Sequence, residues 1–440
     1  MKGELHLFVL WEKARFAEKR ILADIARELE IVCMRELRFD GDPMCRFRQF
    51  YGPALPDARR KVSSCGVGPF LLVVVRDSAP AYGTCTVDGC EYRNVNVRLV
   101  QLKRRYRNWS RRRHRVHGTT TRAEFARDVL MLTGHTADEW AAGEPQGEWR
   151  MRLPDVWLAV SGSKPFAANP VAPGAEPVVE DSRVFLENKY INDTFIDGTF
   201  RGTPCIVKKT TKAVWSIGNE YRLACRMYAA APTVVPRPLG WYYDCAAHAA
   251  AVLMAKVSGP SLTELLARGD TDAQADGFAA DIRALAEALK REGILHRDLF
   301  SDNLLLDSDG HLKAIDWQLA IDRARYREDP WVTRHWKFHY VVFGVNRELG
   351  LGVWNDFHAL GKVLALLPQT AAVKDVAAGL AAETPQMTFA APPDRITRFK
   401  LRLYALSLRV QMFFNRNRPE KYARLRRRWR TIMDPRAGQF

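Results

Sequence analysis

The sequence of 440 residues has no long hydrophobic stretch. No run made only of apolar residues is longer than Pro69–Val75, whereas a membrane-spanning helix needs roughly 20 such residues. Charges at Glu4, Glu12 and Lys13 also leave too short an apolar run for a secretory signal. Since 47% of the residues are hydrophobic, we expect a globular cytoplasmic protein without a transmembrane helix.

Paired cysteines are also lacking. The eight cysteines are Cys33, Cys45, Cys65, Cys85, Cys90, Cys205, Cys225 and Cys245, and none forms a C-x-x-C pair. Cys85 and Cys90 have no second pair or histidine cluster at zinc-finger spacing. The pattern predicts reduced, mostly buried thiols.

Acidic residues are scarce relative to basic ones: 50 Asp and Glu face 67 Lys and Arg, for a net charge of +17. Eight basic residues lie within Lys103–Arg115, and a second cluster extends from Arg416 to Arg430. Between them, Phe399–Phe414 has the pattern of a basic amphipathic helix. We expect peripheral contact with an anionic membrane, at the inner face of the cytoplasmic membrane. Nucleic acid is a less favoured partner, and solvated helix faces are the structural alternative.

The chain divides at a segment rich in proline, alanine and glycine. This pattern predicts a linker over 156–182, a separate domain over 1–155, a second domain over 183–370 and a basic helical extension over 371–440. In the first domain, apolar strands alternate with amphipathic helices, which indicates an α/β fold. The predicted strands are Leu5–Trp11, Ile31–Leu37 and Phe70–Val75, and the predicted helices are Ala14–Leu29, 97–112 and 121–133.

Two features of the first domain suggest chemistry. Asp77 follows a predicted strand, and ligands gather at strand ends in open α/β sheets. His114, His117, Glu124 and Asp128 could form a metal or phosphate-handling cluster, which would make the protein bifunctional. The alternative is structural: Thr121 to Glu124 reads as a capping box, and Asp128 could pair with an arginine.

The most specific pattern is His296-Arg297-Asp298-Leu299-Phe300-Ser301-Asp302-Asn303, followed by a predicted hairpin around Asp309-Gly310 that ends at Asp316. Phosphoryl transfer from ATP needs this layout. Asp298 can orient and deprotonate an attacking hydroxyl, and Asn303 and Asp316 offer oxygen ligands to magnesium. The structural alternative for three nearby residues is that Asp302 and Asp307 form turns and that His296 braces the loop.

Residues from about Val184 to Leu367 resemble the protein-kinase-like fold, an α+β domain with two lobes. The resemblance implies that Lys208 contacts the phosphates of ATP, with Lys209 as the alternative after a one-residue slip. It also implies that Glu220 pairs with Lys208. Gly198 and Gly202 would cover the nucleotide, Met254 and Lys256 would lie at the adenine, and Asp356 would brace the catalytic loop.

Two departures from this resemblance bear on the acceptor. Asp316-Trp317-Gln318 stands where a regulated protein kinase would have Asp-Phe-Gly, and no Ala-Pro-Glu follows it. The resemblance is closest to lipopolysaccharide-core kinases of the Kdo and heptose type, which implies a sugar or glycolipid acceptor, with ATP and Mg²⁺ as cofactors. The rival hypotheses are a serine/threonine protein kinase and a pseudokinase scaffold at a membrane or nucleic acid.

Overall fold

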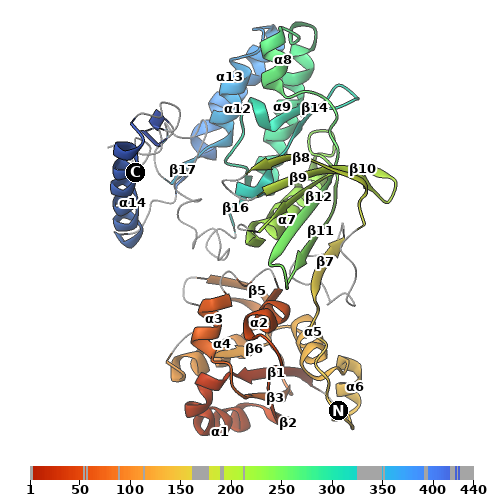
Figure 1. Cartoon of the computed structure of the whole chain (residues 1–440), viewed down its shortest axis with the longest axis vertical. Coiled ribbons are helices and arrows are strands. Elements are labelled where there is room, and N and C mark those ends of the chain that lie inside the picture. The colour runs from red at the N-terminus through yellow and green to blue at the C-terminus, as the bar shows by residue number, and fades with distance from the viewer. Residues whose placement is uncertain are drawn as a thin grey trace.

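The computed structural model shows an N-terminal domain followed by two further lobes (Figure 1). The structure describes residues 3–52, 55, 58–87, 90–111, 114–160, 178–188, 193–211, 214–324, 349, 352–390, 395–416, 422–423 and 425–426. Residues 325–348, which include most of the charged segment after Asp316, lie outside the described residues.

The N-terminal domain is built on a four-stranded sheet in the order β2-β3-β1-β6, with every pairing antiparallel. The predicted alternation of strands and helices is confirmed, but the expected α/β arrangement is wrong, because none of these strands pair in parallel. Its elements are β1 Glu4–Leu10, η1 Glu12–Ala17, α1 Glu18–Glu28, β2 Glu30–Leu37, α2 Pro43–Tyr51, α3 Ala58–Cys65, β3 Phe70–Asp77, β4 Tyr82–Val87, β5 Cys90–Asn96, α4 Val97–Trp109, β6 Val116–Gly118, α5 Arg122–Thr133 and α6 Ala137–Ala142.

The middle lobe is a six-stranded antiparallel sheet, in the order β7-β11-β12-β10-β9-β8, with one long helix, α7, packed against β11 and β12. Its elements are β7 Val156–Val160, β8 Glu180–Asn188, β9 Asp193–Phe200, β10 Thr203–Thr210, α7 Val214–Ala230, β11 Pro238–Asp244 and β12 Ala249–Ala255. The predicted linker 156–182 therefore begins with an edge strand and ends inside β8. The apolar segment 156–160 gains backbone hydrogen bonds by pairing with β11, which a linker would lack.

The last lobe is mainly helical and buries one large apolar core. Its elements are α8 Leu262–Arg268, η3 Asp272–Gln274, α9 Ala275–Glu292, β13 Ile294–Leu295, η4 Ser301–Asn303, β14 Leu304–Leu306, β15 Leu312–Ala314, η5 Trp317–Leu319, β16 Ile321–Asp322, β17 Val353–Trp354, α12 Asp356–Leu364, α13 Ala371–Met387 and β18 Phe389–Ala390. Because Val373, Val376 and Leu380 of α13 enter this core, the lobe extends beyond the predicted boundary at 370. The separate helix α14, Arg395–Phe414, follows it.

The N-terminal domain and the middle lobe share a continuous apolar cluster. Trp11, Phe50 and Trp140 belong to it from one side, and Trp241 and Tyr243 of β11 belong to it from the other. A hydrogen bond of 2.9 Å from Gln49 Nε2 to Asp155 Oδ1 holds α2 beside the residues that lead into β7. The N-terminal domain is thus packed onto the sheet rather than loosely tethered.

Candidate active site

Three charged side chains, from β10, from α7 and from the segment between β15 and η5, meet at one point. Lys208 of β10 places its Nζ 3.2 Å from Glu220 Oε2 and 2.6 Å from Asp316 Oδ1. Burial alone would lower the pKa of this ammonium group, but the two carboxylates outweigh it and raise the pKa. The predicted ion pair between Lys208 and Glu220 is present, and Asp316 forms a second ion pair with Lys208.

The pKa values of the two carboxyl groups, Glu220 and Asp316, shift in opposite directions because their surroundings differ. Burial raises the pKa of Glu220 to about 7, even though Lys208 opposes the shift. Withdrawal from water would also raise the pKa of Asp316, but Lys208 close by outweighs it and lowers the pKa. The Asp316 side chain is 41% exposed, whereas those of Lys208 and Glu220 are 7% and 5% exposed. Asp316 is the member of the trio best placed to bind a cation.

Helix α7 is fixed in the position that keeps Glu220 at Lys208. Asn219 Nδ2 donates a 3.0 Å hydrogen bond to the carbonyl of Ala320, and Gln318 Nε2 donates one of 3.0 Å to Ser216 Oγ. Both bonds tie α7 to the residues directly after Asp316. The Gln that replaces the expected glycine therefore has a structural function, which the sequence alone did not suggest.

The catalytic-loop candidates Asp298 and Asn303 lie together. Asn303 Nδ2 donates to the backbone oxygen of Asp298 at 2.8 Å and approaches Asp298 Oδ2 at 3.4 Å. Burial, followed by the charge of Asp316, raises the pKa of Asp298 to about 7. The Oδ1 atom of Asp298 is buried without a hydrogen-bond partner in the described part of the chain. A buried acceptor of this kind suits a hydroxyl donor from a substrate.

Asp356, at the start of α12, braces this loop as predicted. Its carboxylate accepts hydrogen bonds from the backbone N–H groups of His296 and Arg297, the latter at 3.0 Å. Arg297 has a φ of 70°, a left-handed conformation that is unfavourable for a side chain of this size. The two bonds stabilise that conformation, and His296 Nε2, 2.9 Å from the carbonyl of Ile315, joins the loop to the strand before Asp316.

The two glycines expected at the nucleotide are not beside Lys208. Lys208 pairs with Phe195, whereas Gly198 pairs with Cys205, and Gly202 lies in the turn between β9 and β10. A Cβ at Gly198 would lie 2.5 Å from Val179 Cγ1, so this glycine allows close packing of neighbouring backbone. The preceding hairpin turn, 189–192, lies outside the described residues and contains no glycine. Contact of Gly198 and Gly202 with the nucleotide stays a prediction.

Met254 and Lys256 lie where the chain leaves β12 for the helical lobe. Met254 packs against both the helical-lobe core and the shared cluster, and Lys256 Nζ pairs with Asp197 Oδ2 of β9 at 2.5 Å. Just after them, a Cβ on Gly259 would lie 2.1 Å from the Leu306 carbonyl oxygen. The hinge position is as predicted, but Lys256 is engaged with the sheet.

Asp193 is a further acidic residue near Lys208, and no sequence motif marks it. Asp193, at the start of β9, is buried, and its burial raises the pKa of the carboxyl while Lys208 opposes the shift.

Lys209, the alternative to Lys208 in the sequence prediction, places its Nζ 5.8 Å from the ring centre of Tyr242. Because strand side chains alternate between faces, only Lys208 can reach Glu220 and Asp316.

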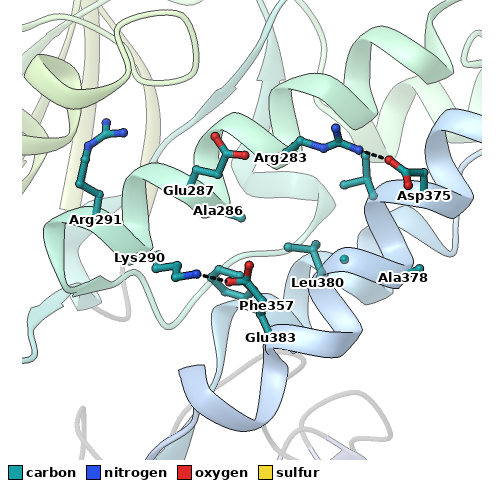
Figure 2. A pocket seen from close by; sticks show the side chains of 12 residues that line it. Arg283, Ala286, Glu287, Lys290, Arg291, Phe357, Asp375, Ala378, Leu380 and Glu383 are labelled. Carbon is teal, nitrogen blue, oxygen red and sulfur yellow. Dashed lines mark hydrogen bonds and ion pairs between the residues drawn. The ribbon is translucent and has the colours of Figure 1, made fainter.

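A surface pocket between α9 and α13 does not coincide with this site (Figure 2). It is lined by Arg283, Ala286, Glu287, Lys290, Arg291, Phe357, Asp375, Val376, Ala378, Gly379, Leu380 and Glu383. Ion pairs from Arg283 to Asp375, and from Lys290 to Glu383 at 2.8 Å, join its two walls. None of the residues assigned to phosphoryl transfer lines it.

The predicted cluster in the N-terminal domain is partly assembled. His117 Nε2 lies 2.7 Å from Asp128 Oδ2. The other carboxylate oxygen, Asp128 Oδ1, accepts a hydrogen bond from Arg127 Nε at 2.7 Å. The capping box is half formed: the Glu124 backbone N–H donates to Thr121 Oγ1, but the Glu124 side chain accepts from the backbone and hydroxyl of Thr120 instead of from the Thr121 backbone. Within the described residues no group of three or more His, Cys, Asp or Glu side chains could hold a metal ion, so the metal alternative is not supported.

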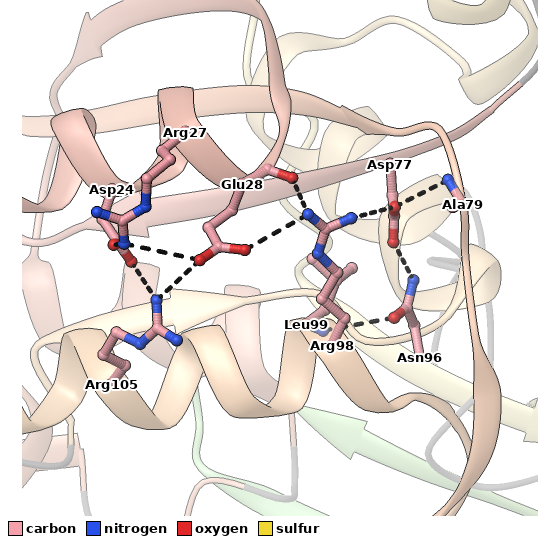
Figure 3. Close-up of polar contacts among 9 residues, drawn as sticks. All are labelled: Asp24, Arg27, Glu28, Asp77, Ala79, Asn96, Arg98, Leu99 and Arg105. Atoms are coloured by element: carbon pink, nitrogen blue, oxygen red, sulfur yellow. Dashed lines mark hydrogen bonds and ion pairs between the residues drawn. The ribbon is translucent and has the colours of Figure 1, made fainter.

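Asp77 is a structural residue (Figure 3). Its buried carboxylate accepts from Asn96 Nδ2 at 2.8 Å, Arg98 Nη1 at 3.2 Å and the backbone of Ala79 at 3.1 Å. In the same network Arg105 Nη1 pairs with Asp24 Oδ2 at 2.7 Å. Part of the basic run therefore binds α4 to α1. The expectation of a ligand at Asp77 was based on an open α/β sheet, and this sheet is antiparallel.

Residues 222–321 match the family model described as the phosphotransferase enzyme family, and no curated protein matches the chain. The matched segment contains Asp298, Asn303 and Asp316, while Lys208 and Glu220 precede it. The chain is a kinase-type phosphotransferase whose phosphate acceptor is an alcohol group. Among the helices that the structure describes, none is long and apolar enough to cross a membrane.

Proposed function

We propose that the protein transfers the γ-phosphate of ATP to a sugar hydroxyl of a lipopolysaccharide core or related surface glycolipid. The observation that supports it most is the closeness of two pairs: Lys208 contacts Asp316, Asn303 contacts Asp298, and the charge of Asp316 contributes to the raised pKa of Asp298. The motif Asp316-Trp317-Gln318 and the lack of a following Ala-Pro-Glu favour a small or glycan acceptor over a protein.

The donor set fits magnesium and a nucleotide. Asp316 and the side-chain oxygen of Asn303 would hold the metal, which supplies charge neutralisation on the phosphates when bound. Lys208, positioned by Glu220, would turn from Asp316 toward phosphate oxygens. Asp298 would accept the proton of the acceptor hydroxyl through its unpartnered Oδ1.

The acceptor can be identified by incubating the full chain with γ-labelled ATP, magnesium and either intact or delipidated lipopolysaccharide. We expect label on the glycan of at least one acceptor, and no label on it with the Asp298→Asn variant. Label only on serine or threonine of a protein would instead support the protein-kinase alternative and contradict the glycolipid assignment.

We also infer a second activity, in which His117 of the N-terminal domain accepts a phosphoryl group. Because a carboxylate can only accept hydrogen bonds, His117 Nε2 donates to Asp128, and the lone pair is on Nδ1. Nδ1 has no hydrogen-bond partner among the residues described. Burial lowers the pKa of His117, against the opposing effect of Asp128, which favours the neutral, nucleophilic imidazole.

Charges of both signs surround His117: Asp128 and Glu124 raise its pKa, and cations lie near it as well. Lys103 acts electrostatically on it, and Lys61 lies over the ring of Tyr51, whose centre is 5.6 Å from that of His117. In the proposed step, Nδ1 attacks the terminal phosphorus of a nucleoside triphosphate and the bond to the β-phosphate oxygen breaks. The nucleoside diphosphate leaves, and the Nε2 proton stays on the ring, held by Asp128.

This second activity predicts an acid-labile, base-stable label on the full-length Asp298→Asn variant after incubation with γ-labelled ATP. Adding His117→Asn should remove the label, whereas the matched change His114→Asn should leave it. If no acid-labile label forms, or if it persists without His117, then His117 is not a phosphoryl acceptor.

A further inference from the structure

Helix α14 has two apolar faces, and only one is covered. Leu401, Ala405, Leu408 and Met412 form a small core with Leu425, supported by Tyr404 and Tyr422. The other face carries Phe399, Leu403, Leu406, Val410, Phe413 and Phe414, each at least 50% exposed. The first five recur at alternating intervals of four and three residues, which aligns them in one stripe along the helix. We call this set of six residues the exposed stripe.

Every charged residue within α14 is basic. Arg402, Arg409 and Arg416 recur every seven residues along one flank of the stripe, and all three are exposed. The guanidinium of Arg416 lies over the ring of Phe413, 5.4 Å from its centre. From 395 to 430 the sequence has thirteen Lys and Arg but a single acidic residue, Glu420. A partner that covers this face must therefore have both an apolar region that can take up the exposed stripe and negative charge that can pair with the arginines.

We propose that α14 lies flat on an anionic lipid surface, with the exposed stripe inserted at the acyl boundary and its arginines at the headgroups. A second copy of the chain fits poorly, although the stripe has coiled-coil spacing. Two such helices would bring arginine rows of equal charge together, with no acidic residue within α14 to pair with them. The proposal goes beyond the phosphotransfer reaction and does not depend on its acceptor.

Co-sedimentation of the full chain with vesicles tests this docking without nucleotide. We expect binding to phosphatidylcholine vesicles that contain phosphatidylglycerol and little binding to phosphatidylcholine alone. The double variant Leu403→Gln/Leu406→Gln should raise the lipid concentration for half-binding by about tenfold. Arg402→Gln and Arg409→Gln should each raise it by about fivefold. The matched control Ser407→Gln, at another exposed position of α14, should bind like the wild type.

Three results would overturn the proposal. One is equal binding to neutral and anionic vesicles, and another is no binding to either. The third is a combination of two observations. The wild type would be a dimer in sedimentation velocity and the Leu403→Gln/Leu406→Gln variant a monomer, and neither protein would bind vesicles. Since the two leucines are exposed, the thermal unfolding midpoint of the variant should equal that of the wild type, which separates lost docking from lost folding.

Discussion

Replacing Asp316 with alanine is expected to abolish phosphoryl transfer while the protein remains folded. Its carboxylate is the partly exposed oxygen donor beside Lys208, and removing it deletes a ligand for the cation that neutralises the phosphates. We expect turnover to fall by about 10³-fold or more. Lys208→Ala should have a comparable effect, because Glu220 and Asp316 would then face each other without a cation.

The chain provides a matched control for this prediction in Lys209. Lys209→Ala removes the same charge one residue away, on the opposite face of β10, and should keep turnover close to that of the wild type. Steady-state assays with circular dichroism on all three variants make the comparison. Substantial ATP consumption by folded Asp316→Ala or Lys208→Ala would contradict the assigned site.

The second large effect is expected from Asp298→Asn. The amide has nearly the same shape but cannot accept a proton, so we expect kcat to fall by about 10²–10⁴-fold with nucleotide affinity retained. Isothermal titration with a nonhydrolysable ATP analogue would measure the affinity.

The same variant should also lose a pH dependence. The pKa of Asp298 is raised to about 7 by burial and the nearby charge of Asp316. Only the deprotonated form can act as a base, so wild-type kcat should decrease as the pH falls through about 7. Asp298→Asn should lack this limb, and an unchanged acid limb in the variant would assign it to another group.

The sequence predicted those parts of the site that rest on short, contiguous patterns. Asp298, Asn303 and Asp316 lie within 19 residues of one another, and the hairpin between them formed as predicted, with Gly310 at a φ of 84°. Lys208, within β10, was identified through the resemblance to the protein-kinase-like fold. The bracing of α7 by Gln318 and Asn219 was not foreseeable, because each bond joins segments about 100 residues apart.

Some features of the structure differ from the expectation for physical reasons. The assignment of Gly198 and Gly202 to the nucleotide stays a prediction, but Gly198 also has a structural function, because it permits close strand packing. The N-terminal sheet was expected to be of the α/β type because its strands and helices alternate in sequence. Alternation does not determine strand direction, and the antiparallel order became visible only with the register.

The most direct test of the account is transfer of radiolabelled γ-phosphate from ATP, with magnesium, by wild type beside Asp298→Asn. We expect label on a non-protein hydroxyl acceptor with the wild type and at least about a 10²-fold slower transfer with the variant. Equal transfer by both proteins, or bound ATP with no transfer to any acceptor by the wild type, would contradict it.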